Sequence, residues 1–141
     1  ASPGVVASVA IPYRAADVFV APPDHENLSN TVLEALACGT PSVAFDIGGM
    51  PDMIEHRANG YLAAAFEVED LAHGLRWVLE DEPRRRTLAA RAREKVLAEF
   101  GPETIARRHL SLYETVLNAA AAAHADGGRQ QRGLRDPAQP D

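Results

Sequence analysis

Short apolar runs alternate with turn-forming residues over the first half of the chain. The runs predict three buried strands, at Asp17–Ala21, Ser42–Asp46 and Tyr61–Ala64. The stretch Asn30–Ala37 has helical spacing and is closed by Gly39 and Pro41, and a short helix is expected near Pro51–His56. This alternation predicts an α/β fold with a Rossmann-like parallel sheet and helices on both faces.

The second half of the chain is expected to be helical. Three apolar stripes mark three helices: Leu71, Leu75, Val78 and Leu79; then Leu88, Ala89, Ala92 and Val96; then Ala106, Leu110, Tyr113 and Leu117. Pro83 separates the first two helices, and the last is expected over Glu103–Ala123. We therefore predict an irregular segment at 1–12, a folded domain at 13–123 and a disordered, Gly/Gln/Arg/Pro-rich tail at 124–141.

The composition fits a single globular domain with a modest core. The chain has 141 residues, of which 46% are hydrophobic, and its formal net charge is −6. Its one cysteine, Cys38, allows no internal disulfide, and this favours a reducing compartment. No apolar run is long enough to span a membrane, and no basic leader opens the chain. These features predict a cytoplasmic location.

Charge is distributed unevenly along the chain. Residues 14–83 carry three basic and thirteen acidic residues, whereas residues 84–108 carry eight basic and three acidic ones. No aromatic residues interleave with the basic cluster around Arg84-Arg85-Arg86, so we expect a solvated helix pair and no nucleic-acid partner. Peripheral contact with anionic headgroups at the inner face of the membrane is an open alternative.

The candidate chemistry lies between His25 and Pro51. Glu26 and Glu34 stand eight positions apart, separated by a polar loop and the first turn of the Asn30–Ala37 helix. The first backbone N–H groups of a helix have no intrahelical partner, and the helix dipole adds positive charge there. Two carboxylates beside such donors suit a ligand that carries phosphates and hydroxyls.

A purely structural interpretation of Glu34 is also available. Thr31-x-x-Glu34 fits a capping box, in which the glutamate only satisfies a backbone donor. Ser29 or Asn30 as the N-cap would explain the composition of the loop equally well.

The order of motifs resembles a known enzyme family. In chain order, the segments are Tyr13–Val20, Glu26-x7-Glu34, Ala35-Leu36-Ala37-Cys38-Gly39-Thr40-Pro41, Gly48–Glu55 and Asn59–Leu62. This run, over about residues 13–100, resembles the donor-binding domain of retaining glycosyltransferases of family 4 (glycosyl transferases group 1), which have the GT-B fold. Within this run, the sequence of residues 30–41 is most similar to that of transferases of bacterial capsule and exopolysaccharide biosynthesis.

The resemblance implies a role for each matching residue. Glu26 would contact the donor sugar near the reacting carbon and would be the catalytic residue. Leu28, Ser29 and Asn30 would offer backbone N–H groups to sugar hydroxyls and phosphate, Thr31 would lie near the diphosphate, and Glu34 would hold the ribose hydroxyls. The ligand would be a UDP- or GDP-sugar, with no metal and no further cofactor, and the acceptor a glycan or a lipid-linked glycan. Asp46 and the Gly48-Gly49 loop end a strand at the same face, where Asp46 either lines the site or merely begins a turn.

The resemblance also implies that the acceptor half and the start of the donor half are not in this chain. We therefore expect the chain alone to be inactive and to need a partner half, or to self-associate through apolar surface at Val18, Val20, Val43 and Phe45. Two alternatives remain: a non-catalytic nucleotide-sugar-binding module that works with a partner chain, and a fragment of a GT-B sugar-nucleotide epimerase.

Overall fold

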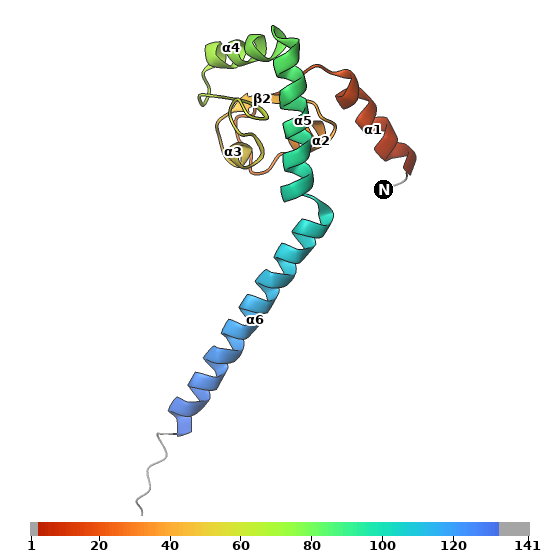
Figure 1. The fold of residues 1–141 in the computed structure, drawn as a ribbon. Coiled ribbons are helices and arrows are strands. Elements are labelled where there is room, and N and C mark those ends of the chain that lie inside the picture. Colours follow the sequence, from red (N-terminus) through yellow and green to blue (C-terminus); the bar gives the residue numbers. More distant parts are fainter. Residues whose placement is uncertain (1–2, 133–141) are drawn as a thin grey trace, which may run out of the picture. The chain divides into compact units, whose positions relative to one another are not determined.

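A computed structural model describes residues 3–132; residues 1–2 and 133–141 lie outside the described part (Figure 1). The chain divides into two compact units, residues 1–101 and residues 102–141, which are described separately. The first unit contains the sheet and the candidate site. The second consists, in its described part, of one helix.

A parallel sheet forms the centre of the first unit. Its strands are β1 (Phe19–Ala21), β2 (Ser42–Phe45) and β3 (Gly60–Ala63), in the order β1-β2-β3. Val20 pairs with Val43, and Val43 with Tyr61. Helix α2 (Asn30–Ala37) joins β1 to β2, and the single-turn helix α3 (Met50–Met53) joins β2 to β3. The α/β prediction and the parallel sheet are confirmed.

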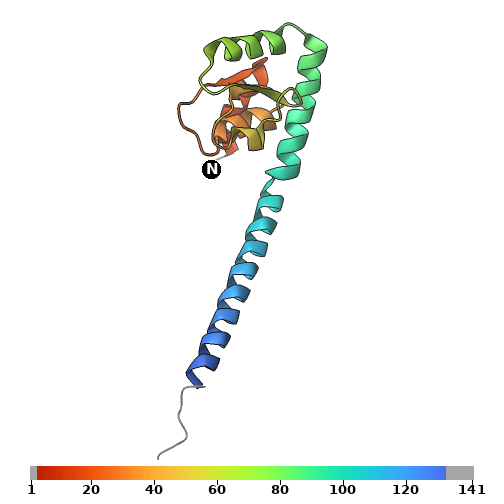
Figure 2. The ribbon, with the colours of Figure 1, turned by 90° about the vertical axis from the view of Figure 1, so that its left-hand side faces the viewer.

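Two apolar clusters cover the two faces of this sheet. Successive side chains of a strand point to opposite faces, so Ala44 joins one cluster while Val43 and Phe45 join the other. The first cluster is completed by α2, α3 and the second half of α5 (Glu82–Glu99), and the second by α4 (Val68–Leu79). Figures 1 and 2 both show the strands between α4 and the pair α2 and α3. All four residues of β2 are buried, as expected for a parallel strand covered on both faces.

This packing contradicts the prediction of exposed apolar residues on the sheet and shows which residues of the predicted helical stripes are buried. Val43 and Phe45 are buried, since α4 covers their face of the sheet, so they do not provide the exposed apolar surface that the sequence suggested. Val18 and Val20 are half-buried. Leu71, Val78, Leu88, Ala92 and Val96 are buried as the helical stripes predicted, but Leu79 is exposed.

Local signals explain the bounds of the helices. At the end of α2, Gly39 adopts φ +78°, its N–H donates to Leu36 O, and the N–H of Thr40 donates to Ala35 O. These two bonds form a Schellman motif, which favours glycine at this position. At the start of α5, the Asp81 carboxylate accepts a hydrogen bond from the backbone N–H of Arg84 (2.8 Å).

The N-terminal segment differs from the prediction. Helix α1 (Pro3–Ala15) occupies most of the stretch that was expected to be irregular, and Pro12 lies inside it. Its last turn is fixed by long-range contacts: the Thr40 hydroxyl donates to Tyr13 O (2.6 Å), and the Tyr13 ring packs edge-on against Phe19 (5.5 Å between centroids). Such tertiary contacts override a weak local preference.

The second unit consists of α6 (Pro102–Arg132) in its described part. The helix continues past Ala123, so residues 124–132 of the expected disordered tail are helical, while 133–141 lie outside the described residues. The apolar stripe predicted for this helix is exposed: Leu110 is 62%, Tyr113 58% and Leu117 68% accessible.

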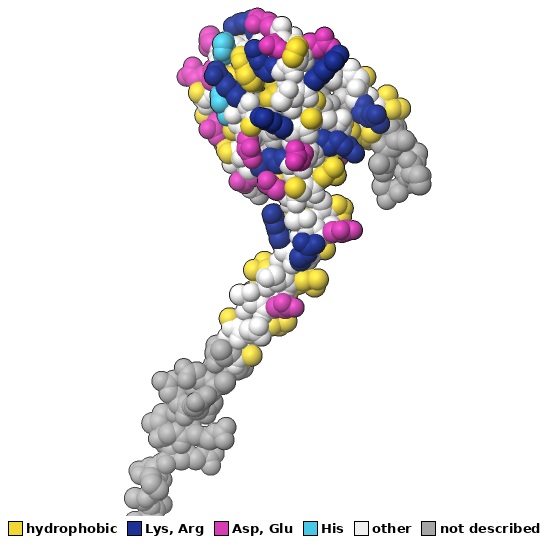
Figure 3. All heavy atoms as spheres, in the orientation of Figure 1, with side chains coloured by type: hydrophobic (Ala, Val, Ile, Leu, Met, Phe, Trp, Pro, Cys, Tyr) yellow, Lys and Arg dark blue, Asp and Glu magenta, His cyan; other side chains and the backbone are white. Residues whose placement is uncertain are grey.

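Four of the six basic residues of α5 form ion pairs within the first unit. Arg84 bonds Asp81, Arg85 bonds Asp17, Arg86 bonds Glu82, and Lys95 bonds both Glu55 and Glu99. The Arg84 guanidinium also lies 4.4 Å from the centroid of the Trp77 ring. Figure 3 shows basic and acidic side chains interspersed over the visible face of this unit. The pattern fits a solvated, ion-paired helix surface.

Candidate functional site

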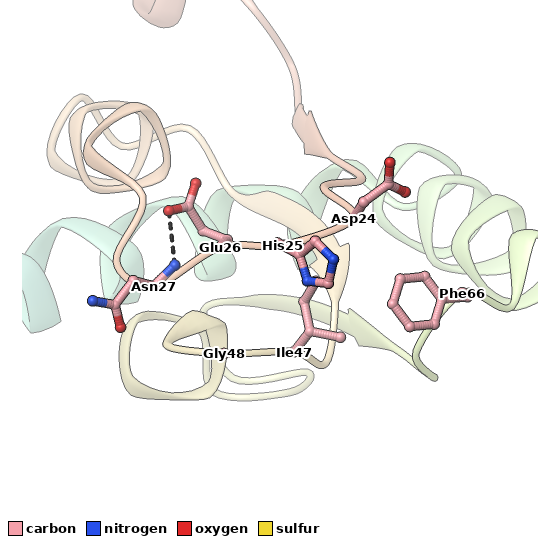
Figure 4. A pocket seen from close by; sticks show the side chains of 7 residues that line it. All are labelled: Asp24, His25, Glu26, Asn27, Ile47, Gly48 and Phe66. Carbon is pink, nitrogen blue, oxygen red and sulfur yellow. Dashed lines mark hydrogen bonds between the residues drawn. The ribbon is translucent and has the colours of Figure 1, made fainter.

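The loops that follow the three strands surround one open pocket of about 450 Å³. Asp24, His25, Glu26 and Asn27 follow β1, Ile47 and Gly48 follow β2, and Phe66 follows β3 (Figure 4). The carboxyl ends of parallel strands meet at one edge of the sheet, which is where open α/β sheets bind ligands. The parallel topology therefore places Glu26 in a pocket at the edge expected for binding.

Glu26 is half-buried at one end of this pocket. Its Oε1 accepts a hydrogen bond from the backbone N–H of Asn27 (3.0 Å), shown dashed in Figure 4. Its second oxygen has no hydrogen-bond partner among the described residues. The carboxylate is thus held by its own loop with one oxygen available to a ligand.

Two glycines bring the loop after β2 against the backbone of the Glu26 loop. A Cβ atom on Gly48 would lie 1.7 Å from Glu26 O, and one on Gly49 would lie 1.9 Å from Asn27 O. Gly48 also adopts φ +52°, a conformation that residues with a side chain rarely take. This approach of two backbones fixes the position of Glu26. Asp46, which the sequence suggested at the same place, is exposed and does not line the pocket.

The N-terminus of α2 begins directly after this loop. Ser29 is the N-cap, but no side chain bonds the free backbone N–H groups of the first turn. The Ser29 hydroxyl instead bonds the Thr31 hydroxyl (3.0 Å), and the Ser29 side chain is buried. The backbone donors of this turn, at Asn30 and Thr31, are therefore available to an external acceptor.

Glu34 does not form the capping box that its spacing allowed. Because the N-cap is Ser29, Thr31 already lies inside the helix, and Glu34 Oε2 accepts a hydrogen bond from the Tyr13 hydroxyl of α1 (3.1 Å). Burial and this bond both raise the pKa of Tyr13, so the phenol remains a neutral donor. The capping-box interpretation of Glu34 is wrong. No local sequence pattern connects Glu34 with Tyr13, which lies 21 positions away.

The structure brings together only some of the residues singled out in the sequence. Glu26 lines the pocket, whereas Leu28, Ser29, Asn30, Thr31 and Glu34 follow it along the loop and the first turns of α2. Ile47 and Phe66 line the pocket and were missed, because nothing in the local pattern connects them to Glu26. Phe66 has φ +64°, an unusual backbone angle that only the structure reveals.

The described part of the chain lacks two other kinds of functional feature, a metal centre and a membrane-spanning helix. Its His, Cys, Asp and Glu side chains form no group of three or more that could hold a metal ion. None of its helices is long and apolar enough to cross a membrane.

The chain is similar in sequence to a known protein family and to a curated protein. Residues 6–95 match the family described as Glycosyl transferases group 1. The N-acetyl-alpha-D-glucosaminyl L-malate synthase of Bacillus anthracis is 33% identical over 101 residues, which cover 72% of this chain and 26% of that enzyme. The chain thus spans about a quarter of the length of this curated relative.

Solved structures show the same similarity. Sucrose-phosphate synthase of Thermosynechococcus elongatus superposes with a TM-score of 0.72 at 34% identity, over 79% of this chain and 28% of that one. Anabaena HepE, crystallised with UDP-glucose, superposes with a TM-score of 0.68 at 27% identity, over 74% of this chain and 29% of that one.

Proposed function

The chain belongs to the glycosyl transferases group 1 family, with the GT-B fold, and we propose that it binds the nucleotide-sugar donor of a retaining glycosyltransferase. The acceptor in this proposal is a glycan or a lipid-linked glycan. One observation carries the proposal: the loop that places Glu26 in the pocket at the carboxyl edge of the sheet leads, within three residues, to the N-cap Ser29 and the uncapped N-terminus of α2.

This arrangement supplies the two kinds of contact that a nucleotide-sugar needs. Free N–H groups and the dipole at the start of α2 favour a diphosphate without a lysine in the loop. Glu26, next to this turn, offers a carboxylate oxygen where the sugar would lie. A half-buried carboxylate stabilises positive charge that develops at the reacting carbon more strongly than a fully solvated one.

We assign the remaining residues by their position on α2. Leu28, Ser29 and Asn30 present backbone N–H groups to the phosphate and the sugar, and Thr31 lies beside the diphosphate. Glu34, one turn further on, accepts hydrogen bonds from the two ribose hydroxyls. Its bond from Tyr13 occupies Oε2 and orients the carboxylate, which leaves Oε1 for the ribose.

The similar structure of Anabaena HepE supports a uridine nucleotide as the first ligand to test, since it was crystallised with UDP-glucose. GDP-sugars remain part of the proposal. Binding of the donor, rather than turnover, is the appropriate test because the chain spans about a quarter of its curated relative.

The test is a titration of the 141-residue chain with UDP, GDP and UDP-glucose, followed by ¹H–¹⁵N NMR. We expect the largest shifts at the amides of residues 27–31. Glu34→Gln should weaken UDP binding about tenfold or more, since hydrogen bonds to a charged acceptor contribute about 1.5–3 kcal/mol. Glu69→Gln, which changes an exposed carboxylate on α4, is the matched control and should bind like the wild type.

Two results would contradict the proposal. One is the absence of shifts with all three nucleotides at millimolar concentration. The other is a set of shifts centred on the groove between Glu55 and Lys95, away from α2.

A further inference from the structure

Phe66 combines three unusual features at one position. Its φ of +64° lies in the left-handed region, where a bulky residue is strained. Its side chain is 57% exposed although it is aromatic. It lines the same pocket as Glu26. Strain of this kind persists where the surrounding structure holds it, and it concentrates at functional sites.

The loop that carries Phe66 is held firmly by its neighbours. The N–H of Glu67 donates to Ala64 O (3.0 Å), which closes a turn around Phe66. The Asp70 carboxylate accepts bonds from the N–H of Ala64 and from the Tyr61 hydroxyl, both at 2.7 Å. The Phe66 ring also packs at 5.9 Å from the Phe45 ring. The ring is therefore presented to the pocket by a fixed turn.

The pocket has walls of two kinds. Phe66 and Ile47 give it an apolar side, while Asp24 and Glu26 give it carboxylates (Figure 4). A pyranose ring has the same division, with a face of C–H groups and a rim of hydroxyls. An aromatic face is negative and attracts C–H groups, and carboxylates accept hydroxyl hydrogen bonds. A few polar groups on an otherwise apolar wall are typical of small-ligand sites.

We propose that Phe66 is the residue on which a hexopyranose ring of the substrate packs, and that it contributes to the choice of sugar. This inference rests on the proposed function, because it names the part of the site that meets the sugar and not the nucleotide. The ring belongs either to the donor sugar or to a sugar of the acceptor, and the experiment separates these sources.

The experiment measures NMR affinities of the wild-type chain and of Phe66→Gly for UDP, UDP-glucose and methyl α-glucoside, the last with UDP present. If the ring belongs to the donor, Phe66→Gly should lower the affinity for UDP-glucose by about two- to twelvefold and leave that for UDP unchanged. If it belongs to the acceptor, only the affinity for methyl α-glucoside should fall. Phe66→Tyr keeps the ring and should bind like the wild type.

Melting temperatures exclude a merely structural role. Glycine relieves the backbone strain at φ +64°, which offsets the lost contact with Phe45, so Phe66→Gly should lose sugar affinity while its melting temperature holds. A structural role would lower both together. Arg57→Gly is the matched control: Arg57 has a similar angle, φ +63°, outside the pocket, so its replacement should leave sugar affinity unchanged.

Failure of the inference and failure of the proposed function give different results. If UDP binds and neither sugar responds to Phe66→Gly, the inference is wrong and the proposed function stands. If UDP and UDP-glucose fail to bind to the wild-type chain, the proposed function is wrong, and the inference, which rests on it, is overturned as well. Absence of all binding to the wild-type chain overturns both.

Discussion

The contact between Gly49 and the Glu26 loop offers a direct test of how the pocket is built. Gly49 has φ −87°, which any residue adopts without strain, so the only obstacle to alanine is the space available. An added Cβ would lie 1.9 Å from Asn27 O and 3.0 Å from Asn27 C. Ordinary contact begins at 3.4 Å, so the two backbones must separate by about 1.5 Å, the difference between 3.4 Å and 1.9 Å.

That separation should cost both stability and ligand binding. Overpacking of this kind costs about 1–3 kcal/mol. For a folded unit of this size, each kcal/mol lowers the melting temperature by about 4–8 °C. Because Asn27 adjoins Glu26 and the start of α2, the same displacement should move the carboxylate and the backbone donors away from a bound nucleotide-sugar. We expect Gly49→Ala to weaken UDP-glucose binding about tenfold or more.

Gly39→Ala is the control that separates lost stability from lost binding. Gly39 has φ +78°, so alanine there costs about 1–2 kcal/mol, yet its Cβ would only reach Ala89 O at 3.7 Å. The two variants should thus lose similar stability in thermal unfolding followed by circular dichroism. Only Gly49→Ala should also lose affinity in the NMR titration. Equal affinities for the two variants, or an unchanged melting temperature for Gly49→Ala, would refute the close approach of the two loops.

The remaining predictions concern catalysis, pH and assembly. In a full-length relative carrying this segment, Glu34→Gln should mainly raise the donor KM and Glu26→Gln should mainly lower kcat; steady-state kinetics check this, and the reverse pattern would overturn the assigned roles. The pKa of Asp70 is lowered below its ordinary 3.8, chiefly by the backbone hydrogen bond from Ala64. The ionised Asp70 therefore stabilises the folded state above pH 3.8, and this contribution is lost as the pH falls through the lowered pKa. Asp70→Asn should therefore be less stable than the wild type at pH 7, and urea unfolding at several pH values should show the difference shrinking below pH 3.8. We also expect the chain to self-associate at micromolar concentration, since the described sheet has unpaired edges at β1 and β3 and α6 exposes an apolar stripe. Analytical ultracentrifugation of the wild type and Leu117→Glu tests this: a clean wild-type monomer contradicts it, and a monomeric variant assigns the contact to α6.

The sequence determined the features that depend on local signals. Helix α2 begins at Asn30 and ends at Ala37 as predicted, and its end is set by Gly39, a glycine suited to positive φ. The parallel sheet followed from the alternation of short apolar runs with helices, since such connections leave few topologies. The spacing of Glu26 and Glu34 around the start of α2, together with the family resemblance, indicated the loop containing Glu26 as the candidate site.

Only the tertiary structure decided how distant residues meet around that loop. The bond from Tyr13 to Glu34, the fit of Gly48 and Gly49 against the Glu26 loop, and the place of Phe66 in the pocket all join segments far apart in the sequence. The capping-box spacing of Glu34 and the irregular character expected for 1–12 were overridden by packing of α1 against α2 and β1. Local patterns fix backbone conformation over a few residues, whereas the contacts that shape a pocket arise only when the faces of separate elements are packed together.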